Sequence, residues 1–451
     1  MPAPALPDRP PFAIRARLLT PLDGGGFADA ADGLVEVGAD GRIAFAGGFA
    51  DRPGGGGAGA PIDVIDLRPW VVLPGMVDLH AHLPQLPNAG VGFALDLLTW
   101  LDRLTFPTER SWADPAVAER LSPPIFRAFA AAGTTTVLAY GVVYEAAMDV
   151  AFRAAEAHGI RAILGKVMMD RVTYDPTIEP STILERSVRE SASLIERWHG
   201  RDEGRLGYAV TPRFAVSCTA ELLRESASLA QSTGAWWQTH VSEDPGEIAE
   251  VARLFPEAQD YLDVYDRAGG LGDRSILAHA IHLSHREIAR LVETGTRVAH
   301  CPASNLFIGA GVMPLVAYLE AGMTVGLASD VSGGPDPSLF SVMRVGAYAQ
   351  MARRSLTGEA GAPLRPLDWL RLGTLDGARA LGLGDRIGSV EAGKEADLIA
   401  VDPSMTSPLA GAAAADAPDD ADSLMSRLIF RAHPDMVRGA WVRGRRLEGP
   451  S

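Results

Sequence analysis

The chain has 451 residues, 47% of them hydrophobic and 22% charged, so it is long enough for a deep core and for two or three folded units. Its formal net charge of −15 argues against nucleic acid or an acidic membrane as the partner, because both need a basic face. The two cysteines, Cys218 and Cys301, cannot build a disulfide framework or a cysteine zinc site. With no signal peptide and no apolar run of membrane length in the sequence, we expect a soluble cytoplasmic protein.

Short strand-like segments separated by glycine turns fill the first part of the chain. They are residues 12–19, 33–37 and 42–45. Similar strand-like segments occur near the other end of the chain, in residues 396–401 and 437–442. This pattern is typical of antiparallel sheet. We therefore expect residues 1–70 and 385–451 to form together a small discontinuous β-sandwich domain.

Between these ends, apolar strands alternate with longer helical stretches over residues 71–384, as in β/α units. Eight strands are predicted, at residues 71–82, 134–141, 161–170, 206–214, 236–243, 275–283, 297–305 and 324–330. Eight parallel strands over this length predict an α/β fold, a (β/α)8 TIM-like barrel with loop insertions. The alanine- and aspartate-rich residues 410–422 are expected to be a linking loop.

The first predicted barrel strand ends in His80-Ala81-His82. Residues i and i+2 of a strand share a face, so both imidazoles can turn toward one metal ion. A lone His-x-His pair is common on protein surfaces. The prediction of a metal site therefore depends on what the other strand ends supply.

Polar residues also end three of the later strands, where barrels carry their catalytic groups. They are His240, His279 and Asp330, with Glu243 shortly after His240. Three imidazoles and one carboxylate suit a divalent ion such as zinc or iron, which makes bound water a nucleophile near neutral pH. We expect Glu243 to move protons as a general acid–base, and His279 to orient the water. Taken singly, Glu243 could be an exposed loop carboxylate and His279 a hydrogen-bonded core residue.

The other six histidines are expected to be structural or surface residues. They are His158, His199, His282, His285, His300 and His433. A cytidine-deaminase-type zinc site is excluded, because that site needs a Pro-Cys-x-x-Cys motif and the two cysteines lie far apart.

The motifs at these strand ends resemble the amidohydrolase superfamily, in residues 74–82 (PGMVDLHAH), the three later strand-end ligands and residues 388–398 (GSVEAGKEADL). Within it the chain is more closely similar to the guanine deaminase family, over about residues 65–402. The segments that carry this closer similarity are 80–85 (HAHLPQ), 99–109 (TWLDRLTFPTE), 165–170 (GKVMMD), 211–214 (TPRF), 239–244 (THVSED) and 299–306 (AHCPASNL).

The resemblance implies hydrolytic deamination of guanine to xanthine and ammonia by a homodimer that holds one zinc ion, with iron as the alternative metal. It implies metal ligands His80, His82, His240 and Asp330, and catalytic roles for Glu243, His279 and Asp330. It implies substrate contacts from His82, Gln85, Arg213, Phe214, His240 and Asp330.

The residues expected to hold the purine suit that ligand chemically. Arg213 offers a planar fork of donors to a carbonyl, Gln85 can donate and accept, and Phe214 provides a stacking wall. Arg213 could instead make a structural salt bridge at a strand end. Trp100 and Phe106 fit a core position as well as a pocket position.

Two segments depart from the guanine deaminase pattern. Residues 140–144 read YGVVY where a histidine is usual, so that Tyr144 is unexpected, and residues 332–337 (SGGPDP) follow an Ala-Ser-Asp in place of Gly-Thr-Asp. Two alternatives therefore stay open. One is an amidohydrolase that deaminates another heterocycle, such as a pterin, an oxidised purine or a triazine, and the other is a non-catalytic scaffold.

Overall fold

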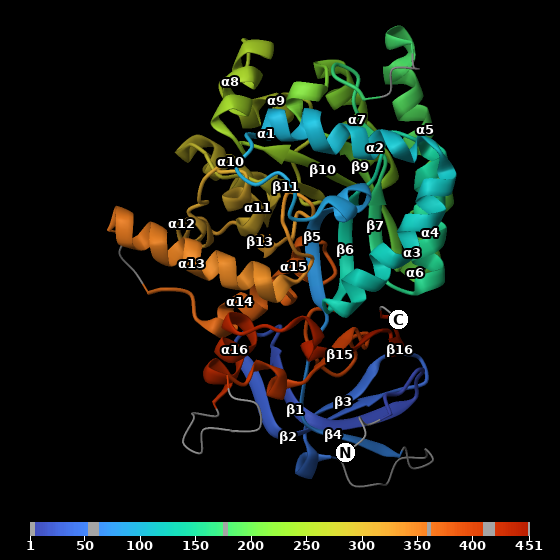
Figure 1. Ribbon diagram of the computed structural model, residues 1–451, viewed down its shortest axis with the longest axis vertical. Coiled ribbons are helices and arrows are strands. Elements are labelled where there is room, and N and C mark those ends of the chain that lie inside the picture. The colour runs from blue at the N-terminus through green and yellow to red at the C-terminus, as the bar shows by residue number, and fades with distance from the viewer. Residues whose placement is uncertain (1–4, 53–62, 175–178, 359–361, 409–419, 450–451) are drawn as a thin grey trace.

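Two β-sheets organise the protein (Figure 1). The computed structural model describes residues 5–52, 63–174, 179–358, 362–408 and 420–449. In Figure 1 a barrel surrounded by helices occupies the upper part of the molecule, and a second sheet lies below it. Among the residues described, no helix combines the length and apolarity needed to cross a membrane.

The upper sheet is the predicted parallel barrel. Its strands in spatial order are β5 (Met76–His82), β6 (Thr134–Tyr140), β7 (Arg161–Gly165), β9 (Leu206–Pro212), β10 (Trp236–Val241), β11 (Ser275–His279), β12 (Arg297–His300) and β13 (Val325–Leu327), and β8 (Val167–Met168) pairs with β9. The first and last strands meet through backbone hydrogen bonds from Asp330 N to His80 O, 2.8 Å, and from His82 N to Val331 O, 2.8 Å. These bonds close the barrel at its carboxyl end and confirm the predicted fold.

Helices follow most barrel strands, and most of them surround the barrel (Figure 1). They are α1 (Leu97–Trp100), α2 (Phe106–Arg110), α3 (Pro115–Ala131), α4 (Glu145–His158), α5 (Ile183–Trp198), α6 (Arg201–Gly204), α7 (Ala220–Thr233), α8 (Pro245–Leu254), α9 (Tyr261–Arg267), α10 (His285–Thr294), α11 (Pro302–Phe307), α12 (Leu315–Glu320), α13 (Leu339–Thr357), α14 (Pro366–Leu372) and α15 (Leu375–Ala380). Local sequence sets their ends. In α10, Ser284 and Glu287 form a capping box at the start, and Gly295 ends the helix with φ +68°.

Most of the predicted strands end later than the observed ones, and for two predicted strands the local cause of the difference is clear. The predicted strand 71–82 is split at Gly75, because β4 (Val64–Pro74) belongs to the second sheet and β5 starts only at Met76. A Cβ at Gly75 would lie 2.0 Å from Oγ1 of Thr135, so only glycine allows this passage. The predicted strand 297–305 ends at His300, since Pro302 starts α11.

The second sheet joins both ends of the chain. Its order is β16 (Arg445–Arg446), β15 (Val437–Val442), β14 (Leu398–Val401), β4 (Val64–Pro74), β1 (Phe12–Pro21), β2 (Phe27–Val37) and β3 (Ile43–Gly48). The β-sandwich predicted for these segments is a single seven-stranded sheet, because β4 pairs with β1 on one edge and with β14 on the other. The predicted loop at 410–422 falls mostly outside the described residues, and its last two residues begin α16 (Ala421–Phe430).

A buried cluster of charges joins the start of the barrel strands to the second sheet. Arg161 at the start of β7 contacts Glu395 Oε2 at 2.6 Å and Asp397 Oδ2 at 3.0 Å, just before β14. Arg386 and Arg443 also reach Glu395, at 2.6 and 2.9 Å. Each carboxylate therefore faces at least one guanidinium, and the cluster connects the two parts of the fold.

Candidate functional site

The predicted site residues meet at the carboxyl end of the barrel, the end away from the second sheet (Figure 1). All of them are buried, and all except His80 line one cavity. The lining residues among those predicted are His82, Gln85, Arg213, Phe214, His240, Glu243, His279 and Asp330. The carboxyl end of a barrel is the usual place of a small-molecule site.

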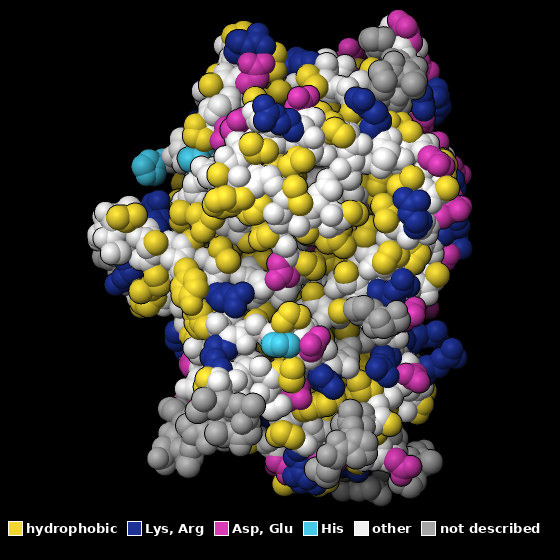
Figure 2. Space-filling model, in the orientation of Figure 1, with side chains coloured by type: hydrophobic (Ala, Val, Ile, Leu, Met, Phe, Trp, Pro, Cys, Tyr) yellow, Lys and Arg dark blue, Asp and Glu magenta, His cyan; other side chains and the backbone are white. Residues whose placement is uncertain are grey.

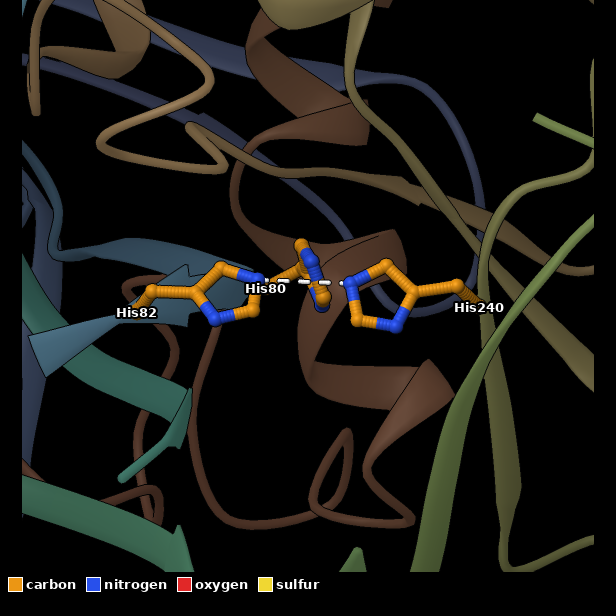
Figure 3. Close-up of side chains that lie close together, drawn as sticks. All are labelled: His80, His82 and His240. Carbon is orange, nitrogen blue, oxygen red and sulfur yellow. Dashed lines mark hydrogen bonds between the residues drawn. The ribbon is translucent and has the colours of Figure 1, made fainter. Parts of the chain in front are cut away.

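Three histidines and one aspartate converge at the floor of this cavity. Nε2 of His80 lies 3.1 Å from Oδ1 of Asp330, and Nε2 of His82 lies 3.4 Å from the same oxygen. Nε2 of His240 lies 3.3 Å from Nε2 of His82, and Figure 3 shows these two rings facing each other with the His80 ring between them in that view. The nitrogens of the three histidines that could bind an ion all lie within 4.8 Å of one another.

The protonation of these rings favours a cation between them. Burial and the neighbouring His80 ring, with His240 beside it, hold the pKa of His82 well below its ordinary value. Burial, His80 and His279 do the same to the pKa of His240. Neutral rings at His82 and His240 present lone pairs. Nε2 of His80 and of His279 has no hydrogen-bond partner among the described residues. Converging lone pairs of imidazole and carboxylate are the donor set of a divalent metal site, so the residues fit such an ion.

Hydrogen bonds behind the cluster fix which ring nitrogen faces the cavity. Nδ1 of His240 lies 2.6 Å from the backbone oxygen of Arg213, and Nδ1 of His279 lies 2.9 Å from Oδ1 of Asn305. In both rings Nδ1 must carry the proton to donate to an oxygen, which leaves Nε2 as the lone pair. These hydrogen bonds at Nδ1 therefore leave Nε2 of both histidines free to accept a proton or bind a metal ion.

The backbone around the site is held in an unusual conformation. Ser242, His279 and Asp330 have φ of +47°, +72° and +47°, in the left-handed region that side-chain-bearing residues seldom adopt. The hydrogen bond from Asp330 N to His80 O helps to hold the last of these turns. Such strain is most often retained where a site requires a particular geometry.

Glu243 lies beside the histidines and is buried with them. Its Oε2 is 3.4 Å from Nε2 of His279, and its backbone N–H donates to Oε2 of Glu247 at 3.0 Å. Burial raises the pKa of Glu243 well above its ordinary value, and the Asp330 carboxylate adds to the effect. A carboxyl that can be protonated near neutral pH is able to give and take protons. Its burial rules out the alternative of an exposed loop carboxylate.

Arg213 and Gln85 lie on another wall of the cavity, and both contact Glu109 of α2. Nη1 of Arg213 is 2.7 Å from Oε2 of Glu109, and Nε2 of Gln85 is 2.7 Å from Oε1. Arg213 thus makes the buried salt bridge considered as its alternative role and also lines the cavity. Trp100 lines the cavity as well, whereas the Phe106 ring packs under the guanidinium of Arg213, 5.3 Å away.

Sequence reasoning missed the residues that support the site from behind. Glu109 stood in a family segment without an assigned role, and Glu247 and Asn305 were not singled out. Glu247 has one signal, because it is the third residue of α8 in a capping box with Asp244 just after Glu243. Contacts between distant segments, such as Gln85 with Glu109, leave no spacing pattern in the sequence.

Comparison with known proteins gives consistent matches along the chain. The model of the Amidohydrolase family matches residues 71–447. A protein of Deinococcus radiodurans described as "Probable guanine deaminase" is 40% identical over 415 residues, 92% of each chain. The solved structure of E. coli guanine deaminase has a TM-score of 0.88 at 31% identity and covers 98% of this chain and 100% of its own. The structure of guanine deaminase from C. acetobutylicum with guanine in its active site has a TM-score of 0.87 at 28% identity, covering 97% and 99%.

Proposed function

The chain belongs to the amidohydrolase family, and from this we propose that it hydrolyses guanine to xanthine and ammonia. One observation carries the proposal. A single cavity places a metal-binding cluster and a protonatable Glu243 together with the Gln85 and Arg213 wall. The relatives named guanine deaminase, one of them with guanine bound, support the same substrate.

We propose that His80, His82, His240 and Asp330 hold one divalent ion, zinc with iron as the alternative, because imidazole nitrogens and a carboxylate lie close together there. When bound, such an ion supplies a nucleophile at neutral pH by lowering the pKa of water. His279 borders the cavity beside these ligands, and together with Asp330, which is one of them, it would orient the attacking water.

Glu243 carries the protons in this proposal. It takes a proton from the attacking water and gives it to the ring nitrogen beside the carbon that bears the amine. After the carbon–oxygen bond has formed, Glu243 would take the second proton from the added hydroxyl and deliver it to the amine. The carbon–nitrogen bond then breaks, the amine leaves as ammonia, and the oxygen remains as the new carbonyl of xanthine. Its raised pKa and its place beside His279 suit both transfers.

The other side of the cavity would hold the purine. Arg213 would donate to the ring carbonyl, Gln85 would contact the neighbouring edge, and Phe214 would form an apolar wall. His82, His240 and Asp330 would touch the end of the substrate that reacts, because they line the same cavity.

The test is direct. Purified protein loaded with zinc and given guanine should lose the guanine absorbance and release one ammonia for each guanine consumed. Fully metallated protein that leaves guanine unchanged would overturn the proposed function.

A different aminated heterocycle is the second candidate, and one feature favours it. Gly333 lines the cavity and belongs to the segment 332–337, which departs from the guanine deaminase pattern. A panel of guanine, a pterin, an oxidised purine and a triazine, compared by kcat/KM, separates the two candidates. The scaffold alternative has no support, because every predicted metal ligand is present in the chain and buried.

We also propose a homodimer, a cytoplasmic location and a division into residues 1–70, 71–384 and 385–451. The family resemblance supports the homodimer, and the acidic charge and the sparse cysteines support the location. Light scattering that shows only monomer would remove the dimer.

The mixture of acidic and basic side chains on the surface supports a small-molecule partner. Figure 2 shows Lys and Arg side chains interspersed with Asp and Glu on the face in view, where a nucleic-acid partner would need a continuous basic surface.

A further inference from the structure

Glu109 connects the two side chains that would read the substrate edge. It is fully buried, its Oε1 accepts from Nε2 of Gln85 at 2.7 Å, and its Oε2 accepts from Nη1 of Arg213 at 2.7 Å. We propose that Glu109 is a specificity-determining positioning residue, which sets the donor and acceptor pattern by which the cavity selects a 6-oxopurine over a 6-aminopurine. The inference deepens the proposed function and rests on it for the identity of the substrate.

Glu109 decides which end of the Gln85 amide faces the cavity. The NH2 group of Gln85 turns toward Glu109 and donates to it, since a carboxylate in a salt bridge with Arg213 only accepts hydrogen bonds. The other end, Oε1, is buried and has no hydrogen-bond partner among the described residues. Gln85 lines the cavity, so this oxygen is left as an acceptor for a ligand N–H.

Glu109 also fixes Arg213. One guanidinium nitrogen donates to the carboxylate while the guanidinium lies over the Phe106 ring, 5.3 Å from its centre. Burial would lower the pKa of Arg213, but the Glu109 carboxylate more than offsets this and raises the pKa above its ordinary value. The side chain therefore stays a charged donor at the cavity wall that it lines.

The resulting wall presents one acceptor, from Gln85, and donors, from Arg213. A matching ligand edge carries an N–H beside a carbonyl oxygen, as in a cyclic amide. Guanine and hypoxanthine have this edge, whereas adenine presents an amine donor beside a ring-nitrogen acceptor. The wall therefore rejects the 6-amino pattern, because it would leave buried polar groups unpaired on both sides.

The substitution Glu109→Gln tests the amide orientation without a change in size. The new amide oxygen would accept from Arg213, and its NH2 group would then donate to Oε1 of Gln85. Gln85 would turn over and present NH2 to the cavity in place of its oxygen. The variant should therefore lose its preference for the cyclic amide edge.

The exchange Gln85→Glu with Glu109→Gln tests the same idea by rescue. The carboxylate at position 85 would accept from the new amide at position 109 and present its second oxygen to the cavity as an acceptor. The double variant should recover part of the lost preference. Gln85→Glu alone puts two carboxylates side by side. This variant should bind hypoxanthine more weakly than Glu109→Gln or the double variant does, which a merely structural role for Glu109 does not predict.

The measurement is calorimetric binding of hypoxanthine and adenine, neither of which carries an amine at the carbon attacked in guanine. Wild type should bind hypoxanthine at least about tenfold more tightly than adenine, and Glu109→Gln should lose at least about tenfold of that ratio, the scale of one buried hydrogen bond. With guanine as substrate, this variant should raise KM more than it lowers kcat. Glu190→Gln is the control, because Glu190 is also buried and paired, with Lys166 at 3.3 Å, outside the cavity.

Each result decides the inference. A folded Glu109→Gln variant that keeps the wild-type binding ratio overturns it, and so does the absence of any rescue by the exchange. If Glu109→Gln does not fold, the exchange variant and the wild-type ratio decide, and equal binding of adenine and hypoxanthine by wild type overturns it. Failure of wild type to deaminate guanine, with the binding ratios as expected, would overturn the proposed function and leave the role of Glu109 standing.

Discussion

The barrel has a buried cluster of ionisable groups at each end, and the two are built on opposite principles. At the start of the strands, Arg161 faces Glu395 and Asp397 at 2.6 and 3.0 Å, so cations meet anions. At the carboxyl ends, His82 and His240 point their nitrogens at each other from 3.3 Å, and both have a pKa well below the ordinary value. The first cluster is complete without a ligand.

The contrast separates buried polar groups that stabilise the fold from buried polar groups that bind a ligand. A paired cluster offsets the loss of hydration within the protein, and its effect is to join two parts of a fold. A cluster in which imidazole nitrogens converge beside a carboxylate has the donor set of an ion site, and such an arrangement is retained where an ion binds. Function is therefore expected at the carboxyl end and stability at the other.

The largest effect is expected from removal of a metal ligand. His240→Ala or Asp330→Ala leaves an incomplete donor set, so the metal content of the purified protein should fall and guanine turnover should be lost. Elemental analysis beside an ammonia assay measures both. Either variant with full metal content and normal turnover would remove that residue from the metal site.

Glu243→Gln should separate the proton carrier from the ligands. The variant keeps the shape of the side chain but cannot exchange a carboxyl proton, so kcat should fall by at least about 10²-fold. Metal content and most of the affinity for guanine should remain, because Glu243 lies outside the proposed donor set. A metal-free or nearly fully active variant would show that the roles in this site are wrongly assigned.

Arg161→Met should act at the other end and on stability alone. It leaves Asp397 and Glu395 buried with fewer partners, which costs about 3–5 kcal/mol of unfolding free energy when a buried pair is broken. Denaturant unfolding measures this loss. Metal content and kcat of the folded fraction should match those of wild type, and a large change in either would mean that the two ends are coupled.

A smaller effect is expected from pH at the paired cluster. Although burial opposes it, Arg161 and its neighbouring arginines lower the pKa of Glu395 from 4.5 to about 2. A lowered pKa in the folded state adds stability that is complete above 4.5 and is lost as the pH falls toward 2. Burial raises the pKa of Asp397, which acts in the opposite direction and reduces the net effect.

Melting temperatures of wild type and Glu395→Gln, compared over this pH range, test that expectation. The variant should melt lower above pH 4.5, and the gap should narrow as the pH falls toward 2. A gap that is constant or widens toward acid would contradict the assigned shift.

Much of the fold and of the site follows from local sequence, and the remainder depends on tertiary contacts. The alternation of eight apolar strands with helical stretches predicted the barrel. Because parallel strands bring their carboxyl ends together, the polar residues at these ends predicted the site residues His80, His82, His240, His279 and Asp330. The apolar run at 71–82 could not reveal that its first part pairs with β1 and β14. Glu109 could not be assigned, because its partners Gln85 and Arg213 come from distant segments.

The central claim is that the cluster of His80, His82, His240 and Asp330 at the carboxyl end of the barrel holds the ion that this protein needs to deaminate guanine. The most direct measurement is a zinc titration of metal-free protein, with the initial rate of ammonia release from guanine recorded at each step. The account predicts a negligible rate without metal and a linear rise that stops at one zinc per chain. Full activity in the metal-free protein, or no ammonia release once every chain holds zinc, would contradict it.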